Sequence, residues 1–317
     1  MGTIIGTCGV YLGCMSNAVY LEYLVKEDPG IGNLVTFSSF LFIAVVGVLY
    51  TLIFRTPKRQ IPIRNYMLVV VVFFTCNVCN NMAFNFKISM PLHMIFRSGS
   101  LITNMLMTIL ILRRKYALSK YLSVGLITSG VILSTLASGK EMKDADKTVE
   151  DGSFFLWLLG IGLLIFGLLI SALLGIFQEQ LFKHYGKHPY EALFYTHLLS
   201  IPVFGFFSNN ILEHFWLALD SRPMGIPVLN IQIPFIIYYL IGNMVTQSLC
   251  IGSVYFLATE ASTLTVTLVI TLRKFLSLIL SIVYFQNPFT LTHWLGTFLV
   301  FIGTVIYSDI PQKLKKH

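Results

Sequence analysis

Charged side chains are scarce in this chain. Asp, Glu, Lys and Arg make up 11% of its 317 residues, and hydrophobic residues make up 56%, whereas a soluble domain is typically about one quarter charged. This shortage excludes an ordinary soluble domain, because too few polar side chains remain to cover a surface in contact with water. The composition predicts instead an all-α polytopic membrane protein, since apolar runs of about 20 residues cross a bilayer as helices.

Cysteine is also rare. The chain holds five cysteines, all within predicted membrane spans, where they behave as small apolar residues. We therefore expect them to pack and to form no disulfide framework. Cys76 and Cys79 have the spacing of a metal site, but no second Cys or His pair completes four ligands, so packing is favoured over metal binding.

Catalytic motifs are missing as well. The sequence contains no GxSxG, HExxH or Walker motif, and its loops are too short for a separate catalytic domain. We therefore predict no enzyme and no cofactor. One enzymatic alternative is an integral-membrane transferase that uses Glu22 or His197 as a base with a phosphorylated donor. It would need a carboxylate-rich metal site, which the sequence does not contain.

Ten apolar runs are long enough to cross a bilayer, and they leave almost no room for a soluble domain. They lie at about 3–24, 32–54, 65–86, 90–112, 118–137, 153–177, 190–212, 233–257, 264–285 and 290–307. The first run has no basic leader and no small-residue cleavage site, so we expect no removable signal peptide.

The net charge of +8 would point to a nucleic-acid partner in a soluble protein. In a membrane protein, the distribution of Lys and Arg among the loops indicates instead how the chain is oriented in the membrane, and no nucleic-acid partner is expected. If the N-terminus is cytosolic, thirteen of the 22 Lys and Arg residues lie on the cytosolic side, six on the far side and three within spans. Cytosolic loops carry the excess of positive charge in membrane proteins. Both termini are therefore predicted to face the cytosol.

The chain divides into two similar parts. Leu118–Gly130 aligns without gaps to Leu291–Gly303, and Arg97 falls opposite Arg273 upstream of them. Five helices in each part would invert the second relative to the first, a plan that places a site at the midplane between two repeats. The predicted units are a first half at 1–139, a polar linker on the far side at 140–152, a second half at 153–308 and a basic cytosolic tail at 309–317.

Three basic residues fall inside membrane spans. Arg273 and Lys274 interrupt the apolar run from Leu264 to Phe285, and Arg97 has no acidic residue within a helical turn. A cation at the bilayer centre costs about 2.5–3.5 kcal/mol on insertion scales. Three such cations with few acids predict an anionic ligand.

Lys274 is the predicted direct contact with a phosphate, because it shares one helical stripe with Thr267 and Thr271. Arg273 lies about 100° away around the helix, where it could orient a neighbouring helix or complete the phosphate clamp. The alternative is a buried ion pair between these cations and Glu22, Glu179 or Glu260.

Polar residues recur on narrow faces of several spans. The stripes are His93, Arg97, Ser100 and Asn104; Asn77, Asn81 and Asn85 with Asn80 beside them; and Tyr239, Asn243 and Gln247. Together they favour a wet cavity, although hydrogen bonds between helices are an equal alternative for any single Asn or Gln. Tyr195 and His197 could equally serve as an interfacial anchor and an interhelical hydrogen bond. Small residues at Gly2, Gly6, Gly9 and Gly13 are assigned to close helix packing.

Long segments of the chain resemble the nucleotide-sugar transporter family, and within it the UDP-N-acetylglucosamine/UDP-xylose transporters. These segments are Met90–Leu101, Phe194–Tyr195, Leu264–Lys274 and Tyr284–Thr290. The resemblance implies ten helices in two inverted halves and exchange of a cytosolic nucleotide sugar for a lumenal nucleoside monophosphate. The family's fourth-span basic residue then falls on Arg97 and its ninth-span lysine on Lys274.

The resemblance leads to a specific hypothesis. A UDP-sugar would enter from the cytosol and UMP would leave from the lumen by alternating access, with Arg97 and Lys274 holding the phosphates. Base and sugar pockets would be shaped by Asn80, Asn81, Tyr195, His197 and Gln247. Thr196 and His197 stand where relatives carry Asn, which bears on base or sugar preference. The alternative is a drug/metabolite or phosphate-ester exporter of the same fold.

The C-terminal sequence Lys313–His317 resembles the KxKxx form of the dilysine retrieval signal. It implies recognition of a cytosolic tail by a coat protein, and residence in the endoplasmic reticulum or Golgi membrane. A generic basic tail that follows the charge rule is the alternative.

Overall fold

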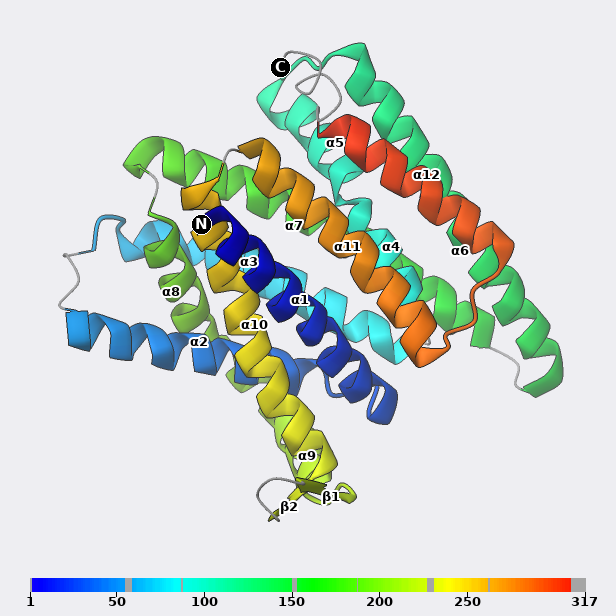
Figure 1. The fold of residues 1–317 in the computed structure, drawn as a ribbon, viewed down its shortest axis with the longest axis horizontal. Coiled ribbons are helices and arrows are strands. Elements are labelled where there is room, and N and C mark those ends of the chain that lie inside the picture. The colour runs from blue at the N-terminus through cyan, green and yellow to red at the C-terminus, as the bar shows by residue number, and fades with distance from the viewer. Residues whose placement is uncertain are drawn as a thin grey trace.

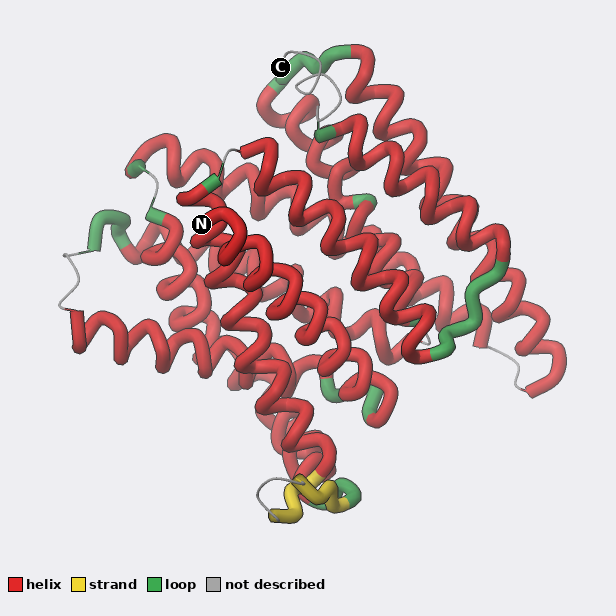
Figure 2. The backbone as a smooth tube through the Cα atoms, viewed as in Figure 1, coloured by secondary structure: helices red, strands yellow, loops and turns green. Residues whose placement is uncertain are grey.

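The chain folds almost entirely into helices. The structure is a computed structural model that describes residues 2–54, 59–86, 88–149, 153–186, 188–226, 231–261 and 263–308. Figure 1 shows long helices packed side by side, with a small hairpin at the bottom of the view. Figure 2 shows how little of the described backbone is strand or loop.

The elements follow one another in a simple order along the chain. They are α1 (Gly2–Glu27), α2 (Gly32–Phe54), α3 (Ile63–Met82), η1 (Ala83–Phe86), α4 (Met90–Ser98), α5 (Ser100–Leu112), α6 (Leu118–Val149), α7 (Ser153–Tyr185), α8 (Pro189–Ser200), η2 (Ile201–Phe207), α9 (Ser208–Leu219), β1 (Pro223–Ile226), β2 (Ile231–Pro234), α10 (Phe235–Glu260), α11 (Thr263–Phe285) and α12 (Leu291–Tyr307).

Eight helical segments of the described chain are long and apolar enough to cross a membrane. This confirms a polytopic, all-α membrane protein, as the composition predicts. Two of the ten predicted runs are not among these eight: η2 divides 190–212 into α8 and α9, and 290–307 forms α12, which has 17 residues. Gly99 separates α4 from α5 within a third run, which still counts as one segment. The η2 segment begins at Ile201 and contains Pro202, whose ring and missing N–H do not allow a continuous α-helix.

Two regions depart from the expected loops. The polar segment predicted as a linker at 140–152 is helical as far as Val149, as an extension of α6. Glu, Met, Lys and Ala in this stretch are good helix formers. The second departure is an antiparallel hairpin, in which Met224 pairs with Ile233. Residues 309–317, which hold the predicted basic tail, lie outside the described part of the chain.

Small residues bring α1 into close contact with α10. A Cβ atom on Gly13 would lie 2.8 Å from the backbone nitrogen of Cys250, and one on Gly9 would lie 2.4 Å from Ser253 Oγ. The predicted packing role of these glycines is therefore confirmed. Glycine is common at such contacts in membranes because it allows two backbones to approach.

The close contact between α1 and α10 corrects the expectation that the cysteines form no disulfide. Cys14 and Cys250 form a disulfide with 4.6 Å between their Cα atoms, so the prediction of five unbonded cysteines is wrong for this pair. The close approach at Gly13 puts two cysteines 236 positions apart within the Cα distance that a disulfide needs. Cys8, Cys76 and Cys79 are free.

Candidate functional site: three cations at the α4–α11 contact

The short helix α4 carries Arg97 into the bundle. Pro91 lies in its first turn, a position where the missing backbone N–H costs nothing. The helix packs against α6, α7, α11 and α12, yet the Arg97 side chain is exposed. The Arg97 side chain is therefore accessible, although its helix packs against four others.

The fold brings the three membrane cations together. Arg273 and Lys274 lie near the middle of α11, which packs on α4. Arg97 is close enough to repel both of them electrostatically, and Arg273 and Lys274 repel each other. Like charges held together in a partly dry site raise the free energy of the empty protein. An anion in this place would remove that cost.

No acidic residue in the described chain pairs with these cations. The side chains of Arg97 and Lys274 make no hydrogen bond or ion pair with any other described residue, and the Arg273 side chain has only a 3.5 Å contact from its Nη1 to Cys250 Sγ. The Arg273 Nε is buried without a partner. A guanidinium has five N–H donors, so most of the hydrogen-bonding capacity of Arg273 is unused.

Two of the three acids that could have neutralised the cluster pair elsewhere, and the third makes no ion pair with it in the described chain. Glu22 lies 3.8 Å from Lys26 and accepts a 2.5 Å hydrogen bond from Asn287. Glu179 pairs with Arg114. Glu260 forms no ion pair with the cluster among the residues described. The structure therefore gives no support to the buried ion-pair alternative.

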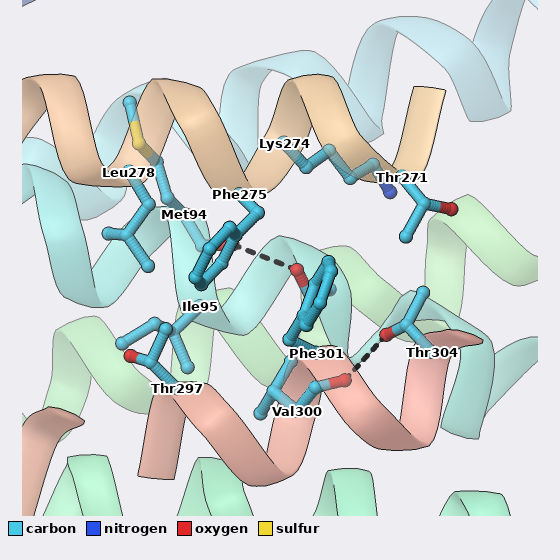
Figure 3. A pocket seen from close by; sticks show the side chains of 11 residues that line it. Met94, Ile95, Thr271, Lys274, Phe275, Leu278, Thr297, Val300, Phe301 and Thr304 are labelled. Carbon is cyan, nitrogen blue, oxygen red and sulfur yellow. Dashed lines mark hydrogen bonds between the residues drawn. The ribbon is translucent and has the colours of Figure 1, made fainter. Parts of the chain in front are cut away.

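A small pocket with a cavity volume of about 30 Å³ lies between α4, α11 and α12, with Lys274 in its wall. In Figure 3 the Lys274 side chain extends along α11 toward Thr271, so these two members of the predicted stripe do share one side of the helix. Most of the remaining wall is apolar, including Phe275 and Phe301, whose rings stack with centroids 4.4 Å apart. Lys274 is the one charged residue among those that line the pocket.

Asn80 is linked to the cation cluster through Cys76, whereas Asn81 bonds to α2. Asn80 donates to the Cys76 carbonyl at 2.7 Å and approaches Cys76 Sγ at 3.5 Å, and Cys76 is within electrostatic range of Arg97. Asn81 instead donates to Thr36 Oγ1 on α2 at 2.7 Å. For Asn81 the hydrogen bond between helices is the observed arrangement.

Tyr195 and His197 belong to aromatic packing on α8. The Tyr195 ring stacks on Tyr66 at 5.4 Å, and the His197 ring contacts Phe40 and Phe73 edge-on at 4.6 and 5.2 Å. His197 Nδ1 bonds the Leu193 carbonyl at 2.7 Å within its own helix. No described contact joins either residue to the cation cluster.

Gln247 lies on α10, three residues before Cys250. Residues at this spacing share one face of a helix, and Cys250 is the residue that Arg273 touches. The helical spacing therefore places Gln247 on the α10 face nearest to Arg273.

Sequence reasoning missed two groups at this site. One is the disulfide beside Arg273, for which the sequence offers no pairing signal. The other is His93, which was predicted only as part of a polar stripe. It is buried against Phe84 with 4.4 Å between ring centroids, and its Nε2 has no partner in the described chain.

Within the described residues, no group of three or more His, Cys, Asp or Glu side chains is placed to hold a metal ion. The three cations, which are unpaired within the described chain, offer charge recognition. Arginine can bind a phosphate through two parallel hydrogen bonds, while lysine acts as a compact charge.

Comparison with known proteins gives matches over almost the whole chain. The model of the UAA transporter family matches residues 2–311. A Danio rerio protein named UDP-xylose and UDP-N-acetylglucosamine transporter is 51% identical, over 99% of this chain and 96% of its own. A Drosophila melanogaster protein named endoplasmic reticulum GDP-fucose transporter is 49% identical, over 98% and 92%. A Homo sapiens nucleotide sugar transporter is 51% identical, over 96% and 93%.

Proposed function

Because this chain belongs to the UAA transporter family, we propose that it carries a UDP-sugar from the cytosol into the lumen of the Golgi or endoplasmic reticulum in exchange for UMP. The family match confirms the resemblance predicted from the sequence, and it confirms a transporter rather than an enzyme. UDP-N-acetylglucosamine and UDP-xylose are the proposed substrates, since the Danio rerio relative, which is 51% identical, is named for both.

The observation that carries the proposal is the cluster of Arg97, Arg273 and Lys274, which repel one another and have no acidic partner in the described chain. A phosphate group supplies the missing negative charge. Arg97 and Lys274 would hold the phosphates, while Asn80 and Gln247 flank them. Tyr195 and His197, both on α8, would contact the base or sugar. Asn81 would shape the same pocket indirectly, because its hydrogen bond holds α3 against α2.

Exchange follows from the charges of the two ligands. A UDP-sugar carries about two negative charges, and UMP carries nearly as many because the second ionisation of a phosphate lies near pH 6. One cluster of cations can therefore serve both. The empty cluster combines like-charge repulsion with poor solvation, so reorientation without an anion is disfavoured. Loaded states would move more readily.

Alternating access would use two inverted halves of five helices. The helix contacts support this proposal, because α1 packs against α10 and α11, while α7 packs against α3 and α5. If each predicted span of the first half corresponds to the span five places later, α1 corresponds to α7, α10 corresponds to α3, and α11 corresponds to α4 and α5. The contacts of α1 with α10 and α11 then correspond to the contacts of α7 with α3 and α5. Such exchange of partners between repeats is compatible with a site at the midplane.

The orientation and location of the protein are further parts of the proposal. The excess of Lys and Arg supports cytosolic termini, and a relative named for the endoplasmic reticulum supports an internal membrane. A coat protein would recognise the tail at 309–317 through its KxKxx sequence.

The test is uptake of labelled nucleotide sugars into proteoliposomes that contain the purified protein. We expect UMP loaded inside the vesicles to accelerate uptake of UDP-N-acetylglucosamine or UDP-xylose strongly, with weak dependence on membrane potential. Equal uptake into empty and UMP-loaded vesicles would exclude exchange. GDP-fucose belongs in the same panel because one relative carries that name, and acceleration by GMP and not by UMP would reassign the base.

A further inference from the structure

The disulfide between α1 and α10 lies directly beside the cation cluster. Cys14 and Cys250 are 4% and 6% exposed, and Cys250 Sγ is 3.5 Å from Arg273 Nη1. This is the one hydrogen-bond contact of the Arg273 guanidinium within the described chain. The position of Arg273 therefore depends on where α10 holds this sulfur atom.

The disulfide also joins helices from the two halves of the sequence. Around it, Gly9 and Gly13 on α1 leave no room for a side chain against α10. One turn further along α1, Asn17 donates to the Asn243 carbonyl at 3.1 Å. A covalent bond within a close-packed seam prevents the two helices from separating. In any rocking motion, α1 would therefore move together with α10.

We propose that the Cys14–Cys250 disulfide is a redox-sensitive positioning element of the binding site. It fastens α1 to α10 as one moving body and holds Arg273 where its guanidinium contributes to anion binding. This inference rests on the proposed function for its effect on affinity, but the bond itself can be tested without a ligand.

Reduction supplies the physical link between the bond and the site. Two small thiol molecules donate two electrons and two protons, so that Cys14 and Cys250 become thiols and the reductant becomes a disulfide. After reduction α1 still packs on α10 at Gly9 and Gly13, but the Cys250 side chain is free to rotate, so the sulfur contact of Arg273 is no longer fixed. Arg97 repels Arg273, so an unrestrained Arg273 moves away from the cluster. The affinity for a phosphate ligand then falls.

The first experiment counts reactive cysteines in the full-length protein, purified without reductant. After denaturation and alkylation, mass spectrometry should find three modified cysteines, which are the free ones, and five when a reductant is added first. Five modified cysteines without reductant would overturn the inference, because the tether would then be absent.

The second experiment measures the Kd of UMP by calorimetry for the oxidised protein, the reduced protein and the Cys14→Ser/Cys250→Ser variant. We expect the Kd to rise about three- to tenfold when the bond is lost. In an Arg273→Gln background, loss of the bond should cause no further rise. Cys8→Ser is the matched control, because Cys8 is free and exposed on the same helix; it should keep the Kd unchanged.

Equal Kd values for the oxidised and reduced proteins would overturn the inference, as would an undiminished effect in the Arg273→Gln background. If the double serine variant does not fold, the reduced wild-type protein still gives the comparison. A protein that has the bond but binds no UMP in any form would contradict the proposed function, and with it the link to affinity, while the alkylation count would still stand.

Discussion

At the scale of single residues, Lys274 and Arg97 can be tested as ligand contacts rather than structural ion pairs. We predict that Lys274→Ala and Arg97→Ala each abolish exchange and weaken UMP binding by at least about tenfold, since a hydrogen bond to a charged group contributes about 1.5–3 kcal/mol. Because the cations repel one another, the empty Lys274→Ala protein should unfold at the same or a higher temperature than wild type, without stabilisation by UMP. Thermal unfolding with and without UMP measures both effects.

Arg222→Ala is the control for this prediction. Arg222 is exposed and pairs with Glu27 at 3.3 Å, away from the cluster, so its loss removes one positive charge and should leave UMP stabilisation intact. A Lys274→Ala protein that unfolds far below wild type, and that recovers when an acidic residue is also replaced, would show that Lys274 has a structural ion-pair role.

At the scale of elements, the contact between α6 and α12 depends on glycine. A Cβ atom on Gly130 would lie 2.4 Å from the Gly296 carbonyl oxygen, whereas nothing lies within 4 Å of one on Gly125. Both glycines are on α6. We predict that Gly130→Ala destabilises the protein by about 1–3 kcal/mol through overpacking. Gly125→Ala should be neutral or slightly stabilising, because alanine is the better helix former. Thermal unfolding of both variants in detergent compares them, and equal unfolding temperatures would show that α12 can move aside.

At the scale of the whole molecule, orientation in the membrane can be tested at two exposed positions. Lys115 follows α5 and Gly225 lies in β1, and the charge distribution assigns them to opposite sides of the membrane. In a Cys8→Ser background, Lys115→Cys should react with an impermeant thiol reagent in sealed vesicles that expose their cytosolic face. Gly225→Cys should react only after detergent is added. The reverse pattern would invert the proposed direction of transport.

The sequence by itself determined the class of protein, most helix positions and the residues of the charge cluster. Apolar runs and their interruptions are local properties, so the predicted run at 32–54 matches α2 (Gly32–Phe54), and Arg97 and Lys274 stand out wherever their helices pack. Only the tertiary structure decided which helices meet. It brought Arg97 beside Arg273, bonded Cys14 to Cys250 across 236 positions and placed His197 among aromatic rings. The physical reason is that helix pairing depends on how well whole helix surfaces fit together. The role of a small residue such as Gly13 therefore depends on which helix it allows to approach.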